Sequence, residues 1–261
     1  YVNSVLTNQF AARSFKVLPS IPYQKTTKKI GFKNFTLRPF NVATENMLLL
    51  IKDSQDPKEI FSAILQVVDD CLEDENKGQA RKLHAHVVEM LFIELRKISN
   101  GTTLPLSLVC NKPIIKDGEE VQCGTQSKHE LNLEKVILVE PDNYRSVFDV
   151  VGDNSIILKM KEMTAENFLS FSSKDKTTAE GIAGYVESVT YQDTVTAADE
   201  ISLEELVSWC GTIPSSVKLQ IAKDYFGALP HIFLSVPFEC SNPACGCKQE
   251  ITFDTVLDFF I

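Results

Sequence analysis

The sequence predicts an α+β protein that has an N-terminal helical domain with a short β entry and a module of two cysteine-containing β-hairpins far apart in the chain. Helical and alternating apolar patterns fill separate stretches, which is typical of this class. The predicted divisions are an extended basic arm (1–29), the helical domain (30–103), the first cysteine hairpin with a β segment (104–160), a helical insertion (161–230) and the second cysteine hairpin (231–261).

The N-terminal half carries clear start and stop signals. Alternation from Lys29 to Phe40 predicts one or two short strands. Thr44 is the predicted N-cap of a helix over 45–52, and Asp56-Pro57 starts a second helix with one apolar face. A longer helix over 79–98 is predicted to end at Asn100-Gly101.

Short alternating segments predict strands from Leu104 onward. The alternating segments are 104–110, 130–139, 155–160 and 231–261. Between them, 164–190 has a weak helical pattern and 192–200 is predicted to be an acidic loop. Ser202 and Glu205 form a capping box before a helix, and 214–226 predicts another amphipathic helix.

Charge is unevenly distributed along the chain. The first 44 residues contain seven basic residues and no acid, although the whole chain has 26 basic and 35 acidic residues and a net charge of −9. This asymmetry predicts an arm that lies on an acidic surface of its own chain or of a partner; a solvated arm is the alternative. The acidic balance argues against general nucleic-acid binding, and no apolar run is long enough for a membrane helix, so neither is an expected partner.

Two cysteine segments share one pattern. Cys110 follows an alternating segment, Cys123-Gly124 comes after a loop, and Lys-x-Glu-apolar-x-apolar-acid-x-Val follows; Cys240, Cys245-Gly246 and the same pattern recur near the C-terminus. Glycine after the second cysteine permits a tight turn. Twelve residues separate the first pair and four the second, whereas two are usual at a zinc knuckle.

Two such pairs complete a tetrahedral Cys₄ shell, so the module is predicted to be zinc-ribbon-like, with a structural zinc ion bound by Cys110, Cys123, Cys240 and Cys245. Such an ion would contribute to the folding of hairpins that bury little apolar surface. Cys247 is an alternative ligand to Cys245. Metal-free hairpins held by packing, or ordinary buried thiols at Cys123 and Cys240, are the other interpretations.

The remaining cysteines and histidines favour structural roles. Cys71 and Cys210 lie on apolar helical faces and are predicted to be buried free thiols. His84 and His86, two apart on a predicted helix, should face different directions. His129 is a candidate outer-shell residue beside the first cysteine pair, and His231 is expected to be structural.

Catalytic patterns are missing from the sequence. It contains no glycine-rich phosphate loop and no Gly-x-Ser-x-Gly elbow, and its acids at 69–75 resemble a solvated helix end. We therefore expect no enzyme, no catalytic residue and no small-molecule substrate.

Several motifs, in order along residues 30–261, resemble the T-even-type phage baseplate hub subunit and hub assembly proteins. They are Arg38-Pro39-Phe40 with Val42, Glu45 and Leu48-Leu49-Leu50; Leu95-Arg96-Lys97 with Ser99 and Gly101; Tyr225-Phe226 with Leu229-Pro230; and Cys240, Cys245-Gly246 and Asp258-Phe259-Phe260. The chain departs from that pattern in having Leu229 where the family has methionine, in longer cysteine spacings and in the basic arm.

The resemblance implies a structural component of the baseplate hub region of a contractile-tailed bacteriophage, which contacts other baseplate and hub proteins during tail assembly. It implies synthesis in the host bacterial cytoplasm and a final location in the virion tail. A transient hub assembly catalyst or chaperone is the first alternative. A zinc-ribbon nucleic-acid-binding factor is the second, although acids dilute the lysines around the cysteines.

Overall fold

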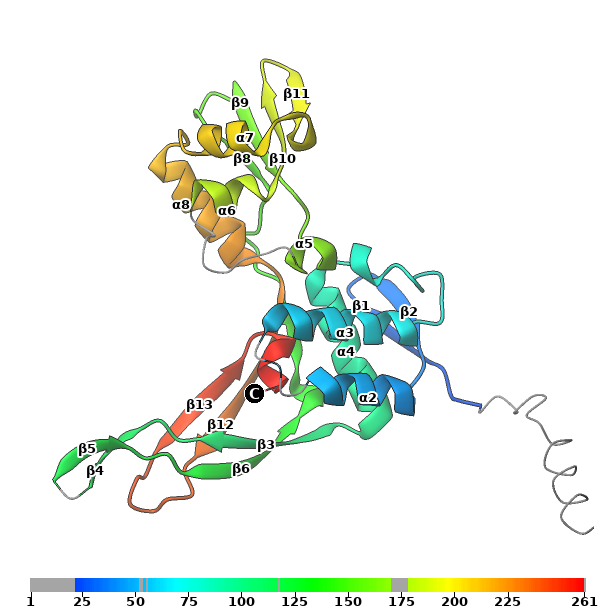
Figure 1. Cartoon of the computed structure of the whole chain (residues 1–261), viewed down its shortest axis with the longest axis vertical. Helices are drawn as coiled ribbons and strands as arrows, with labels where there is room; N and C mark the ends of the chain where they lie inside the picture. The colour runs from blue at the N-terminus through cyan, green and yellow to red at the C-terminus, as the bar shows by residue number, and fades with distance from the viewer. Residues whose placement is uncertain (1–21, 52–53, 55, 117, 170–177, 261) are drawn as a thin grey trace, which may run out of the picture.

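The computed structural model describes residues 22–51, 54, 56–116, 118–169 and 178–260. The structure combines helices with strands whose described pairings are all antiparallel, in agreement with the predicted α+β class. Figure 1 shows helices α2–α4 on one side, long hairpins that project to the other side, and a further lobe above both. Each region has its own apolar cluster. No described helix has the length and apolar character that a membrane crossing needs.

The largest core joins a β-hairpin to helices. Its first elements are β1 (Thr26–Ile30), β2 (Lys33–Leu37), α2 (Val42–Ile51), α3 (Pro57–Cys71) and α4 (Ala85–Asn100). The start of α3 is as predicted: the Asp56 side chain accepts a hydrogen bond from Lys58 N at 2.9 Å. One face of α3 is buried in this core: Ile60, Phe61, Ile64, Leu65, Val67, Val68 and Cys71.

Two helix starts differ from prediction. Helix α2 begins at Val42, because Asn41 rather than Thr44 caps it: Asn41 Oδ1 accepts from Thr44 N at 2.9 Å. Helix α4 begins only at Ala85, after His84 in an extended conformation. Its end is as predicted, with Gly101 at φ 87°. Of the predicted arm, residues 1–21 lie outside the described residues, and its last residues form β1.

The acids at the end of α3 are not merely solvated. Asp74 Oδ2 accepts from Thr36 N at 2.5 Å, and Glu73 forms a salt bridge with Lys25 at 3.2 Å. Asp69 Oδ1 accepts from Ala80 N at 3.0 Å. These carboxylates therefore fix the β1–β2 hairpin and the turn before α4 to the end of α3.

The two cysteine hairpins lie side by side, as the sequence predicted (Figure 1). The first comprises β3 (Thr103–Val109) and β6 (Gln126–Asn132), with β4 (Pro113–Lys116) and β5 (Glu119–Gln122) at its tip; the second comprises β12 (His231–Glu239) and β13 (Lys248–Phe253). Strand β7 (Ile137–Val139) pairs with β12 and joins the two hairpins. The hairpin bases, including Leu131 and Leu234, pack in the main core, and the chain then ends in the 3₁₀ helix η5 (Val256–Phe260).

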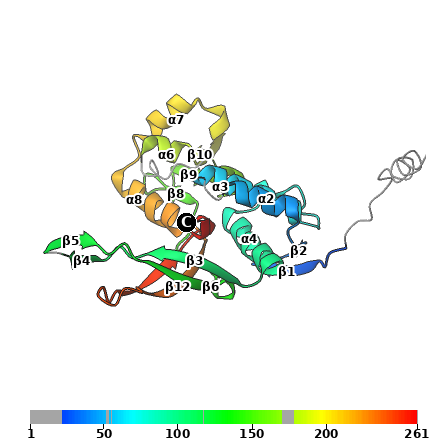
Figure 2. The same cartoon turned by 60° about the horizontal axis from the view of Figure 1, so that its bottom comes forward.

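The further lobe is a four-stranded antiparallel sheet with helices. Its strands, in the order β11-β10-β9-β8, are β8 (Val147–Asp149), β9 (Ile156–Met160), β10 (Val186–Tyr191) and β11 (Thr194–Ala197); its helices are α6 (Ala179–Ala183), α7 (Leu203–Cys210) and α8 (Ser215–Asp224). Helix α5 (Ala165–Leu169) lies between this lobe and α3 (Figure 1), and Figure 2 shows α6, α7 and α8 beside strands β8–β10 of the lobe.

Strands β10 and β11 differ from what the sequence predicted. Val186 and Val189 were placed in a helical pattern, and 192–200 in a loop. Pairing of β10 with both β9 and β11 prevails over that weak periodicity, and β-branched residues suit a strand with neighbours on both sides. Strands β8 and β9 share this lobe's core, although the sequence analysis grouped them with the first cysteine hairpin.

Candidate metal centre

Four cysteine sulfurs meet between the tips of the two hairpins. The Sγ atoms of Cys110, Cys123, Cys240 and Cys245 all lie within 4.8 Å of one another. Cys110 Sγ is 3.7 Å from Cys245 Sγ, and Cys123 Sγ is 3.8 Å from Cys240 Sγ. A tetrahedral zinc ion with Zn–S bonds of about 2.3 Å places its sulfur ligands about 3.8 Å apart. The four residues predicted from sequence therefore have the spacing that a metal ion needs.

Equivalent positions of the two hairpins supply the sulfurs. Cys110 directly follows β3 and Cys240 directly follows β12. Cys110 N donates to the carbonyl of Thr125 at 3.0 Å, and Cys240 N donates to the carbonyl of Cys247 at 3.0 Å. Cys247 thus takes the place that Thr125 has in the first hairpin, two residues after the second cysteine.

The matching positions of the two hairpins identify Cys245, and not Cys247, as the candidate metal ligand. Cys247 is 5% exposed and packs in the same small cluster, but it is not one of the four residues whose sulfurs converge. The signal was present in the sequence, because the hairpin alignment sets Cys245-Gly246-Cys247 against Cys123-Gly124-Thr125.

Each second cysteine is followed by a glycine in the left-handed region. Gly124 has φ 63° and Gly246 has φ 56°. A side chain at such a position costs about 1–2 kcal/mol, which glycine avoids. The sequence-based reason for these glycines is therefore confirmed.

The twelve residues between Cys110 and Cys123 contain a small β-hairpin of their own, β4 and β5. Strands β4 and β5 pair with each other, and Cys123 N donates to the carbonyl of Lys112 at 2.9 Å, which closes the base of the insertion. In the second pair, Cys245 N donates to the carbonyl of Asn242 at 3.0 Å. Cysteines separated by very different loops therefore present the same geometry.

The surroundings of the cysteine thiols shift their pKa values in different directions. Hydrogen bonds from the side chain and backbone of Thr125 lower the pKa of Cys123 to about 6, whereas burial raises the pKa of Cys245 to about 12. Asn242 N lies 3.4 Å from Cys240 Sγ, and Asn242 Nδ2 lies 3.6 Å from Cys123 Sγ. These N–H groups would stabilise thiolates, the form that binds a metal.

Contacts beside the sulfurs hold the two tips together. Ser241 N donates to Ser127 Oγ at 3.0 Å, and Lys112 Nζ donates to the carbonyl of Cys245 at 3.2 Å. Phe238 is buried in the same apolar cluster as the cysteines, and the His129 ring packs on it with centroids 5.1 Å apart. His129 thus supports the apolar surroundings of the site.

We expect Cys245→Ala to abolish metal binding and Cys247→Ala to leave one ion per chain. Cys245 belongs to the converging set, whereas Cys247 matches a threonine in the other hairpin. Elemental analysis for zinc and iron after gel filtration measures the difference, because tetrahedral sulfur sites bind either metal. Metal loss on Cys247→Ala with retention on Cys245→Ala would reverse the assignment.

The other residues considered in the sequence lie away from this site. Cys71 and Cys210 are buried free thiols, as predicted, and burial raises the pKa of each to about 11. The expectation for His84 and His86 was wrong: their rings stack with centroids 5.4 Å apart, because His84 precedes the helix. His231 Nδ1 lies 3.0 Å from the carbonyl of Leu229.

The burial of Glu89 was not predicted from the sequence. Glu89 is 5% exposed, and its Oε1 accepts from Thr255 Oγ1 at 2.6 Å and from Val256 N at 3.0 Å. It therefore connects α4 to the chain segment after β13. No local pattern marks it, because its partners lie more than 160 residues away in the sequence.

Comparison with known proteins yields one match. A family model described as "T4 bacteriophage base plate protein" matches residues 21–261. Searches of curated proteins and of solved structures found no match. The matched range includes both cysteine hairpins, the helices and the further lobe.

Proposed function

The chain belongs to the family of T4 bacteriophage base plate proteins, and on that premise we propose that it is a structural component of the baseplate hub region. In this role it contacts other baseplate and hub proteins during tail assembly and stays in the virion tail. The family match over nearly the whole chain carries the proposal. It acts through binding rather than catalysis.

The cysteine module suits a permanent part of an assembly. We propose that its four sulfurs bind one structural zinc ion. Cys110, Cys240 and Cys245 are buried, and four sulfur ligands fill a tetrahedral shell, so no coordination position stays open for a substrate. The ion would hold together two segments that are more than 110 residues apart and would stiffen the projecting hairpins.

Basic residues near the N-terminus of this chain form ion pairs with acidic residues of its helical core. Lys25 pairs with Glu73, and Lys28 Nζ lies 2.7 Å from Glu94 Oε2. Near the cysteines, Lys248 pairs with Glu239 at 2.9 Å, and Lys112 contacts a backbone carbonyl. These lysines already have partners in the chain, which favours protein contacts over a basic nucleic-acid surface.

Quantitative mass spectrometry of purified virions and of tail assembly intermediates tests the proposal. We expect peptides of this chain in both, at a fixed ratio to other tail proteins. A transient assembly factor would be found in the intermediates and missing from virions, and that result would overturn the structural role. A tail protein of known copy number serves as the internal standard.

A further inference from the structure

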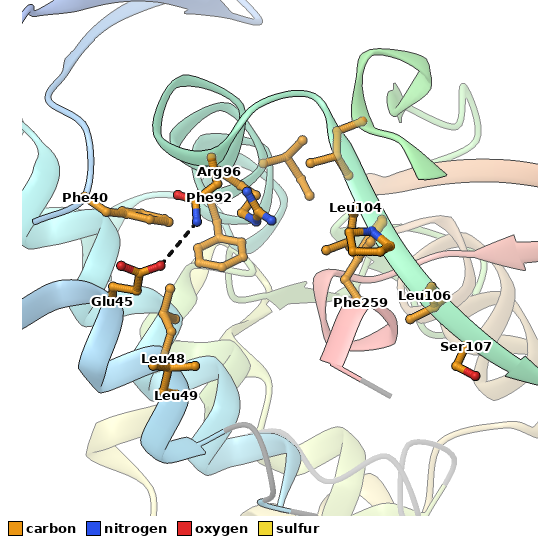
Figure 3. A pocket seen from close by; sticks show the side chains of 14 residues that line it. Phe40, Glu45, Leu48, Leu49, Phe92, Arg96, Leu104, Leu106, Ser107 and Phe259 are labelled. Carbon is orange, nitrogen blue, oxygen red and sulfur yellow. Dashed lines mark hydrogen bonds between the residues drawn. The ribbon is translucent and has the colours of Figure 1, made fainter. Parts of the chain in front are cut away.

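An apolar groove lies beside α2, between that helix, α4, β3 and the C-terminal turn. Its volume is about 490 Å³. Figure 3 shows Leu48 and Leu49 from α2 on one side, Phe92 and Arg96 from α4 at the back, and Leu104, Leu106 and Phe259 opposite. Aliphatic and aromatic side chains thus line most of a groove that opens to solvent.

Helix α2 is unusually apolar for its exposure. Of its ten residues, Thr44 alone is buried, while Val42, Leu49 and Leu50 are 73%, 60% and 85% exposed. Contiguous exposed apolar surface marks interaction sites in folded proteins. Leu49 both lines the groove and is largely exposed, so a bound segment would cover it.

Arg96 should make the groove prefer a ligand that carries a carboxylate. Its Nη1 is buried without a hydrogen-bond partner, and Arg96 makes no salt bridge with any residue that the structure describes. Glu45, which lines the same groove, attracts Arg96 through its charge but makes no salt bridge with it, and its carboxylate accepts from Asn100 Nδ2 at 3.3 Å, the dashed line in Figure 3. A buried guanidinium N–H group without a partner is costly, and a carboxylate would satisfy it best.

We propose that this groove binds a segment of another baseplate protein that presents bulky aliphatic side chains and one carboxylate, and that the carboxylate pairs with Arg96. The proposal rests on the proposed baseplate function. The N-terminal arm of this chain does not meet the requirement, because residues 1–21 contain Arg13 and Lys16 but no acid. Charge complementarity therefore favours a partner protein over the arm.

Photo-crosslinking in infected cells tests the proposal. A benzoylphenylalanine is placed at Leu49 and, as a control, at Leu219, which is 69% exposed on α8 in the further lobe. Tail intermediates are isolated after irradiation, and the adduct is sequenced by mass spectrometry. We expect the Leu49 adduct to join a segment of another tail protein with aliphatic residues around an Asp or Glu, and the Leu219 adduct to lack that segment.

Arg96 variants add the charge test. We expect Arg96→Met to lower the Leu49 adduct about tenfold or more, and Arg96→Lys to retain a substantial part of it. Arg81→Met, at an exposed arginine outside the groove, should leave the yield unchanged. The melting temperature of the free Arg96→Met chain should not fall, because the substitution removes a buried N–H group without a partner.

Four results of the crosslinking would overturn the groove proposal: no Leu49 adduct, an adduct to the chain's own arm, an adduct to a second copy, or a yield that does not depend on Arg96. A marked fall in the melting temperature of Arg96→Met would assign Arg96 to folding instead and would also overturn it. If the chain is missing from tail intermediates, both proposals fail. If the chain is present there without the expected adduct, the groove proposal alone fails.

Discussion

Replacing both Cys110 and Cys240 with serine is expected to abolish metal binding and to unfold the tips of both hairpins, while the helical core stays folded. The variant leaves two sulfurs, too few for a stable tetrahedral site. Binding of structural zinc contributes about 10–16 kcal/mol to the folding of small zinc modules. Few other contacts hold the tips, namely Ser241 with Ser127, Lys112 with Cys245 and the small cluster around Phe238, and β4 and β5 are almost wholly exposed.

Elemental analysis and hydrogen exchange measure this prediction together. Metal should fall from one ion per chain to none. Amide protection should be lost in 108–127 and 238–249 but kept in α3 and α4, whose core does not include the cysteine cluster. Cys210→Ala, in the core of the further lobe, is the matched control and should keep the metal. Equal metal content in the double variant and the unmodified chain would refute a site at these cysteines.

Replacing Glu89 should have the next largest effect, with opposite signs for two substitutions. Glu89→Ala leaves the hydroxyl of Thr255 and the N–H of Val256 without their acceptor and opens a cavity, so we expect a loss of about 3 kcal/mol in the free energy of unfolding. Glu89→Gln keeps an oxygen acceptor and removes the ionisable group. It should be at least as stable as the unmodified chain at pH 8.

The pH dependence of stability gives Glu89 a distinct signature. Burial raises the pKa of this carboxyl group above its usual value, against the hydrogen bonds from Thr255 and Val256. The folded state therefore favours the protonated form, and this contribution is full below about pH 4.5 and is lost as pH rises through the folded-state pKa. The stability of Glu89→Gln relative to the unmodified chain should thus rise from pH 4 to pH 8.

Urea unfolding at several pH values measures both effects. Glu166→Gln, at an exposed glutamate on α5, is the control and should show no such pH-dependent gain. If Glu89→Gln were less stable than the unmodified chain at pH 8, the carboxylate would be a stabilising charge, and the assigned direction of its pKa shift would be wrong.

Local signals in the sequence predicted several features correctly because the interacting residues are close in the chain. The start of α3 at Asp56-Pro57 depends on hydrogen bonds within the next turn, as does the capping box of Ser202 and Glu205. The glycines after Cys123 and Cys245 follow from the left-handed turn that each hairpin makes there. The pairing of the two cysteine hairpins followed from their repeated pattern.

Features that depend on long-range packing could not be predicted in this way. Val186 and Val189 belong to a strand because β10 pairs with the edge of β9, almost 30 residues earlier in the chain. The burial of Glu89 depends on a segment more than 160 residues away, and the groove at α2 is closed on one side by residues near the C-terminus. Such surroundings depend on how separate elements pack, which periodicity within one element does not encode.

The sequence by itself determined that four cysteines in two repeated hairpins form one cluster and that the chain is a baseplate-type protein. The repeated pattern already set Cys245 against Cys123, and the tertiary structure decided that this alignment holds: hydrogen bonds between strands give Cys247 the position of Thr125, and the Cys245 sulfur lies 3.7 Å from that of Cys110. It also decided that Arg96 Nη1 is buried at an apolar groove without a hydrogen-bond partner. The physical reason is the same in both cases: a side chain's chemistry is set by its sequence, but its partners are set by the packing of distant segments.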